Sequence, residues 1–237
     1  MRQFKAWVTG CLSGGLIAIA GLAAADTKPV LVELFTSQGC SSCPPADAFL
    51  HALSARDDVI ALALHVDYWD YIGWKDSFAQ PAFTKRQKAY AKAGGRRSVY
   101  TPQMIIAGQD HVIGTHEEDV GILIRRHTLR DSGVELAVSL GDGGQVSIQA
   151  EAPATLTGPV IIYLARYTPH QTVEITRGEN AGKTVGYTNV VSEWTTIGEW
   201  DPKEPLRMQT KVTGDAPGVV VLQKSNAGAV VAAAYLR

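Results

Sequence analysis

The chain has 237 residues, a formal net charge of -1, 46% hydrophobic residues and 19% charged residues. This length suffices for one large domain or two small ones, and the composition is that of a folded globular protein. The near-neutral charge gives no support for nucleic-acid binding, which calls for a basic surface.

The first 25 residues are typical of a secretory signal peptide. Arg2 and Lys5 make a basic start, 12–22 is a short apolar core, and Ala23-Ala24-Ala25 offers a small-residue cleavage site. The apolar core is shorter than the roughly 20 residues of a membrane span, and no other segment comes close, so we predict no stable span. We therefore expect a periplasmic or secreted protein whose mature chain begins at Asp26.

Cys11 falls within the signal peptide, so the expected mature chain keeps two cysteines, Cys40 and Cys43, in a Cys-Ser-Ser-Cys motif. The motif follows a predicted buried strand at 30–36 and precedes a predicted helix at 45–55. A helix N-terminus favours negative charge, so a thiol there ionises more easily than the free pKa of about 8.5 allows. Cys43 lies one turn on, close enough to resolve a mixed disulfide formed on Cys40. A structural disulfide and half of a zinc site are the alternatives.

A continuous apolar run at 59–66 predicts a second strand, which is parallel to the first because a helix separates them. Ligands gather at the carboxyl ends of such strands, which places His65 near the rim that holds Cys40. The next segment, 67–76, is rich in aromatic residues and carboxylates. It is either a loop that forms a substrate surface over the cysteines or a loop that only packs against the core. A helix is predicted at 81–94.

A proline enters an apolar strand at 98–106, which is unusual because proline cannot donate to a sheet. The position is explained if the Thr101–Pro102 bond is cis and lies beside the cysteines, leaving backbone groups free for a substrate peptide. An ordinary trans proline on an edge strand is the alternative. A hairpin strand at 111–114 and a helix at 117–128 complete this half of the chain.

This order of strands and helices, with its Cys-x-x-Cys helix and Thr-Pro strand, resembles the thioredoxin-like fold. The resemblance implies that Cys40 is the attacking cysteine, that Cys43 resolves, and that Pro102 is the cis-proline packed against them. It also implies that Glu33 is a buried acid able to accept the proton of Cys43, although an ordinary strand-end carboxylate fits the sequence equally well. No Trp precedes Cys40 and the spacer is Ser-Ser, so the direction of electron flow stays open.

Longer stretches of the chain, FTSQGCSSCPPAD, HVDYWDYIGWKD, YTPQM and RGENAGKTVGYTNVV, resemble a family of exported bacterial proteins of unassigned function with a thioredoxin-like N-terminal part. The resemblance covers nearly all of the expected mature chain. It implies the fold and export of the protein, but it does not identify a substrate.

From about Ser132 short apolar or alternating runs recur, among them 160–167, 172–176, 185–192 and 195–199, with glycine-rich turns between groups of them. This spacing is typical of an antiparallel β-sandwich. We therefore predict an α/β thioredoxin-like domain at 26–131 followed by an all-β sandwich-like domain at 132–237. The segment 177–183 is expected to form a hairpin loop, or to contact the first domain near the thiols.

The leading hypothesis is an exported thiol–disulfide oxidoreductase that needs no cofactor, with Cys40, Cys43, Thr101, Pro102 and Glu33 as its site. Its partners would be protein thiol or disulfide clients and a redox partner protein. The hypothesis requires that Cys40 can be reached from solvent and that Pro102 lies on the same rim.

Two other hypotheses remain open. A periplasmic copper-binding protein or copper chaperone would use the thiolates, with His65, His111 or His116 completing the site. A non-catalytic thioredoxin-like binding module would keep a static disulfide, and a buried Cys40 would favour it.

Overall fold

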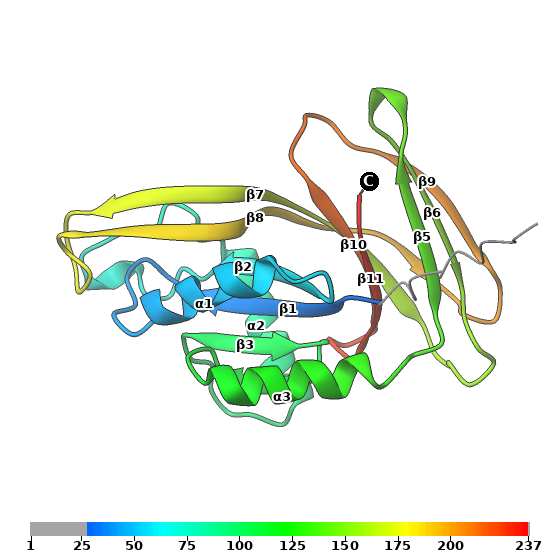
Figure 1. Cartoon of the computed structure of the whole chain (residues 1–237), viewed down its shortest axis with the longest axis horizontal. Helices are drawn as coiled ribbons and strands as arrows, with labels where there is room; N and C mark the ends of the chain where they lie inside the picture. Colours follow the sequence, from blue (N-terminus) through cyan, green and yellow to red (C-terminus); the bar gives the residue numbers. More distant parts are fainter. Residues whose placement is uncertain (1–27, 237) are drawn as a thin grey trace, which may run out of the picture.

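The computed structural model describes residues 28–236 (Figure 1), and these contain three α-helices and eleven strands. The first half of the chain contributes β1 (Val30–Thr36), α1 (Pro44–Ser54), β2 (Val59–His65), α2 (Pro81–Ala93), β3 (Gln103–Ile106), β4 (Asp110–Ile113) and α3 (Glu117–Thr128). The second half contributes β5 (Glu135–Leu140), β6 (Gln145–Glu151), β7 (Val160–Ile175), β8 (Lys183–Trp200), β9 (Leu206–Lys211), β10 (Gly218–Lys224) and β11 (Val230–Tyr235). The predicted signal peptide lies outside the described residues.

Eight of these strands form one mixed sheet in the order β11-β10-β7-β8-β2-β1-β3-β4. β1 runs parallel to β2 and antiparallel to β3. β8 joins the edge of β2 in parallel through one register pair, Ala63 and Val190. The other three strands form a small sheet in the order β5-β6-β9.

The predicted fold class, a thioredoxin-like α/β domain followed by an all-β sandwich, is wrong. The described chain has more residues in strands than in helices, it has only three α-helices, and its main sheet takes strands from both halves. The sequence runs at 160–167 and 172–176 belong to the single strand β7, and those at 185–192 and 195–199 belong to β8. Register shifts at Ile162/Tyr163 and Arg166/Tyr167 interrupt the alternation of side chains, which is why two long strands have the sequence pattern of four short ones.

The proposed division of the chain at residue 131 stays a prediction. Such a division would pass between β2 and β8, which are neighbours in one sheet.

β1 is buried on both faces because its alternate side chains face different helices. Val32 and Leu34 pack with residues of α1 and α3, whereas Leu31 and Phe35 pack with residues of α2. A third cluster joins the small sheet to β7 and β10, on the side of the molecule away from α1 (Figure 1). The pleat of β1 therefore decides which of its side chains can reach the start of α1.

Glu33 lies on the α2 side of β1, in a buried polar network. Its carboxylate is fully buried and accepts hydrogen bonds from Arg86 Nε at 2.6 Å and from the Tyr90 hydroxyl at 2.5 Å. The Arg86 guanidinium carbon lies 3.8 Å from the ring centroid of Trp194 on β8, and its Nη2 donates to Gln223 of β10 at 3.1 Å. This network ties α2 to strands from both halves of the chain.

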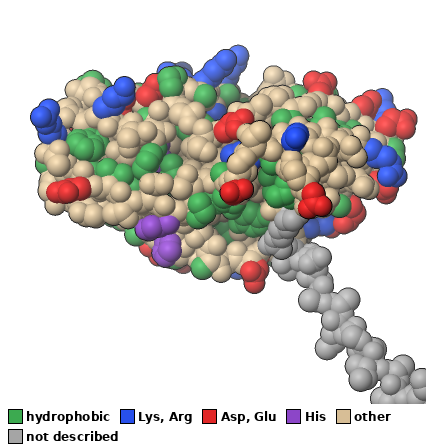
Figure 2. Space-filling view, turned by 90° about the horizontal axis from the view of Figure 1, so that it is seen from above, with side chains coloured by type: hydrophobic (Ala, Val, Ile, Leu, Met, Phe, Trp, Pro, Cys, Tyr) green, Lys and Arg blue, Asp and Glu red, His purple; other side chains and the backbone are tan. Residues whose placement is uncertain are grey.

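No helix within residues 28–236 is long and apolar enough to cross a membrane. On the face shown in Figure 2, Lys and Arg side chains are interspersed with Asp and Glu, so that face carries no extended basic surface.

Glu33→Ala should lower the free energy of unfolding by about 3–5 kcal/mol, because it leaves the Arg86 guanidinium buried without its carboxylate. Urea denaturation monitored by circular dichroism measures this change. The control is Arg56→Ala, which breaks a partly exposed pair with Asp58 and should cost no more than about 1 kcal/mol. Equal losses in the two variants would contradict the assignment of the buried pair as the stronger constraint.

Candidate functional site

Cys40 and Cys43 form a disulfide with a Cα–Cα distance of 5.4 Å. Cys43 is the N-cap residue of α1 and is followed by Pro44 and Pro45, which suit the first turn because their missing N–H groups would be unpaired there. The amide of Cys43 donates to the Cys40 carbonyl at 3.2 Å, so Cys40 lies in the turn just before the helix. The disulfide therefore lies between the end of β1 and the start of α1, as the sequence predicted.

The Thr101–Pro102 peptide bond is cis, as predicted. Pro102 lies close to α1, with Gly114 between them. A Cβ atom added at Gly114 would be 3.0 Å from Ala46 Cβ of α1 and 3.1 Å from Pro102 Cβ. Trp69 Nε1 donates to Thr101 Oγ1 at 2.7 Å. Trp69 also packs against Gly39, where an added Cβ would lie 3.3 Å from Trp69 Cβ. Thr101 and Pro102 thus lie at the same end of the sheet as the disulfide loop.

The aromatic segment at 67–76 holds the disulfide loop through Gln38. Trp74 Nε1 donates to Gln38 Oε1 at 2.8 Å, and the Gln38 amide donates to Asp76 Oδ2 at 2.8 Å. The same Asp76 oxygen lies 2.7 Å from His65 Nδ1, and both side chains are fully buried. This segment is therefore packed against the site, and His65 belongs to the same rim.

Glu33 is separated from the disulfide by the plane of the sheet. Its carboxylate is engaged by Arg86 and Tyr90 on the α2 side, whereas Cys43 starts α1 on the other side. Of the five residues predicted for the site, the structure brings together Cys40, Cys43, Thr101 and Pro102 and leaves Glu33 outside.

Asp47 is the acidic residue that the sequence interpretation missed. It lies one helical turn after Cys43, to whose carbonyl its amide donates at 3.1 Å, and it is 3% exposed. Burial raises the pKa of the Asp47 carboxyl to about 7, although the nearby His65 and Thr36 favour its charged form. The i, i+4 spacing from Cys43 was the signal available in the sequence, since residues so spaced share one helix face.

The tip of the β7–β8 hairpin contacts the disulfide loop and reaches the same end of the molecule as the β1–α1 loop (Figure 1). Asn180 Nδ2 donates to the carbonyl oxygens of Gln38 and Cys40, both at 2.9 Å. Cys40 is 2% exposed and Cys43 is fully buried. The segment 177–183 is thus a hairpin loop that also contacts the disulfide loop, and the expectation that Cys40 is open to solvent is wrong for this conformation.

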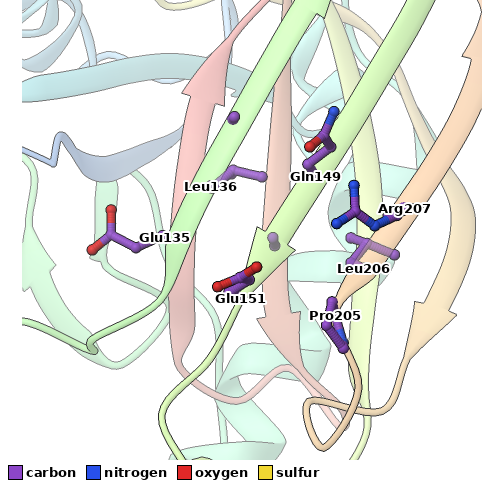
Figure 3. Close-up of a pocket in the computed structure, with 9 residues that line it drawn as sticks. Glu135, Leu136, Gln149, Glu151, Pro205, Leu206 and Arg207 are labelled. Atoms are coloured by element: carbon purple, nitrogen blue, oxygen red, sulfur yellow. The ribbon is translucent and has the colours of Figure 1, made fainter.

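Two shallow cavities lie elsewhere. One, of about 240 Å³, sits on the small sheet between Glu135, Glu151 and Arg207 (Figure 3) and does not include the disulfide loop. The other, of about 450 Å³, is lined by Tyr100, next to Thr101, and by side chains that include His111 and His116.

Within residues 28–236, no group of three or more His, Cys, Asp or Glu side chains is clustered so that it could hold a metal ion. His65, one candidate ligand of the copper hypothesis, is buried against Asp76. His111 and His116 line the second cavity together.

Comparison with known proteins places most of the chain in one family. The model of a family described as "protein of unknown function (DUF1223)" matches residues 31–231. The crystal structure of protein AGR_C_4864 from Agrobacterium tumefaciens, a structural-genomics target, is similar with a TM-score of 0.75 and 35% sequence identity, covering 87% of this chain and 93% of that one. No curated protein matches this chain.

Asp47→Asn should remove a pH dependence of stability. The folded protein holds the Asp47 proton more tightly than the unfolded chain, since the pKa rises from 3.8 to about 7. The parent should therefore lose stability relative to the variant as pH rises from about 4 to about 7, by about 1.4 kcal/mol per unit of pKa difference. Urea unfolding of both proteins across this range measures the effect. Asp57→Asn, at an exposed site, is the control, and a parent–variant difference independent of pH would contradict the assignment.

Proposed function

We propose a function from the geometry of the site, because the chain belongs to the DUF1223 family of proteins of unknown function. The function is thiol–disulfide exchange with partner proteins through Cys40 and Cys43. The observation that carries this proposal is the pairing of a disulfide at the N-terminus of α1 with a buried carboxyl, Asp47, one turn further along the same helix.

In the oxidised protein, a thiolate of the partner attacks Cys40 Sγ. The bond between Cys40 and partner forms as the Cys40–Cys43 bond breaks, and Cys43 leaves as a thiolate. A second partner thiolate then attacks the partner sulfur of the mixed disulfide, and Cys40 leaves as a thiolate. The partner departs with its two cysteines joined in a disulfide, and the Cys40–Cys43 pair has gained two electrons. The reverse sequence reduces a partner disulfide, with Cys40 as the attacking thiolate and Cys43 as the resolving one.

Asp47 suits the role of proton carrier for Cys43. A carboxyl with a pKa of about 7 is protonated and deprotonated to similar extents near neutral pH, where a proton acceptor and donor works best. It gives a proton to the Cys43 thiolate when the disulfide opens and takes it back when Cys43 resolves. Glu33 cannot serve in this role from the α2 side of β1.

We assign the protein to the periplasm or the cell exterior, on the basis of the predicted signal peptide. Disulfides persist in such compartments, so a partner with a redox-active thiol pair is needed to turn the site over. The reduction potential decides the direction of electron flow, since oxidants near -120 mV and reductants near -270 mV are well separated.

A static structural disulfide is the competing function, and the burial of Cys40 favours it. The two functions differ in one measurable respect. A structural disulfide resists reduction, with a potential below about -300 mV, whereas an exchanging pair has a higher one.

Cys43→Ser should trap partner proteins in mixed disulfides through Cys40, because the variant lacks the thiol that resolves them. Non-reducing gels and mass spectrometry of the variant purified from its native host detect the trapped species. The matched control, Cys40→Ser, should trap far fewer, since Cys43 is fully buried. Failure to trap any partner, together with a potential below about -300 mV, would favour the static disulfide.

Asp47→Asn should slow reduction of the Cys40–Cys43 bond by a partner dithiol about a hundredfold at pH 7, since general acid–base catalysis contributes about that much or more. The pH profile is the diagnostic part of the measurement. The parent should show an inflection near the Asp47 pKa of about 7, and the variant should lose it. A slower variant that kept this inflection would show that Asp47 only supports the structure.

A further inference from the structure

The carbonyl groups of the disulfide loop are held by a side chain from the other half of the chain. Cys40 O already accepts a hydrogen bond from the Cys43 amide, and Asn180 Nδ2 takes its second acceptor position. The other N–H of the same carboxamide donates to Gln38 O. Lys183 Nζ donates to Asn180 Oδ1 at 2.8 Å and so fixes which way the carboxamide faces.

A side-chain carboxamide has the same donor chemistry as a peptide group. An extended polypeptide that presented backbone N–H groups to Gln38 O and Cys40 O could therefore replace Asn180 bond for bond. It would also bring its own side chains next to Cys40, which is 2% exposed with the hairpin tip in place.

The hairpin tip and its stem are held by different contacts. The stem is held by an apolar cluster of Ile175, Val185, Tyr187 and Val190 packed with Trp74 and Phe78. Between 176 and 182 the tip buries one residue, Asn180, and its other residues are exposed. Gly178 and Gly182 have positive φ angles of 75° and 82°, which glycine adopts without strain.

We propose that Asn180 occupies the position of a client backbone, and that the partner of this site is an extended, cysteine-containing polypeptide segment that displaces the hairpin tip. The segment donates backbone N–H groups to Gln38 O and Cys40 O, and its thiolate attacks Cys40 Sγ. A mixed disulfide with Cys40 forms as the Cys40–Cys43 bond breaks, and Cys43 leaves as a thiolate. This inference rests on the proposed thiol–disulfide exchange and names its substrate class.

The test follows reduction of the Cys40–Cys43 bond in the full-length protein by three thiols. The first is an unstructured decapeptide with one central cysteine, the second is the same peptide N-methylated at the residues flanking the cysteine, and the third is 2-mercaptoethanol. Alkylation and mass spectrometry give the rates. Asn180→Ala and Asn180→Asp both remove the donors, the second with little change of shape, and Glu179→Ala at the same exposed tip is the control.

We expect both Asn180 variants to react with the plain peptide at least about tenfold faster than the parent, since each variant removes two hydrogen bonds of ordinary strength between the tip and the disulfide loop. Glu179→Ala should match the parent. In the Asn180 variants the N-methylated peptide should lose several-fold in rate against the plain one, because it lacks the backbone donors.

Peptide rates within twofold of the parent in both Asn180 variants would overturn the inference, as would equal rates for the plain and N-methylated peptides. If one of these two results is found but 2-mercaptoethanol readily reduces the Cys40–Cys43 bond of the parent, the proposed exchange function stands and only the extended polypeptide is excluded as its partner. If no thiol reduces the bond in any variant, the exchange function fails, and the inference fails with it.

Discussion

The short parallel contact between β2 and β8 is the constraint on which the rest of the structure depends. One register pair joins the two strands, and the side chain of Asn189, at a φ of 48°, adds a hydrogen bond from its Nδ2 to Ala61 O at 2.9 Å. His51 Nδ1 of α1 lies 3.0 Å from Thr188 Oγ1, which is on the same stretch of β8. Because β8 is anchored here, the remainder of the β7–β8 hairpin is directed past α1 toward the disulfide loop.

This anchoring explains why the hairpin tip meets the disulfide loop, in which both cysteines are closed to solvent. The start of α1 and the Thr101–Pro102 bond lie at one end of the sheet, and the hairpin tip arrives there from the second half of the chain. Near the start of α1, Asp47, His65 and Asp76 are buried close to one another, so the interior next to the disulfide loop is polar.

Local features of this site were predictable from the sequence, and long-range ones were not. The strand–cysteine–helix order and the cis bond at Pro102 follow from short stretches in which one residue type limits the backbone. The choice between Glu33 and Asp47 depends on which helix covers which face of β1, and that depends on contacts with distant segments. Sequence alternation likewise could not show that β7 and β8 are long strands with internal bulges, nor that Asn180 meets Cys40.

The guanidinium of Arg86 is surrounded by side chains from two parts of the chain. Glu33 and Tyr90 form one side, and Trp194 and Gln223 form the other. A fragment ending near residue 131 would lack the contacts of Trp194 and Gln223 with Arg86. It would also expose the edge of β2, and an exposed strand edge can pair with strands of other molecules. For recombinant production, the two halves of the protein are thus best expressed together as one polypeptide, which contains all the side chains that surround Arg86.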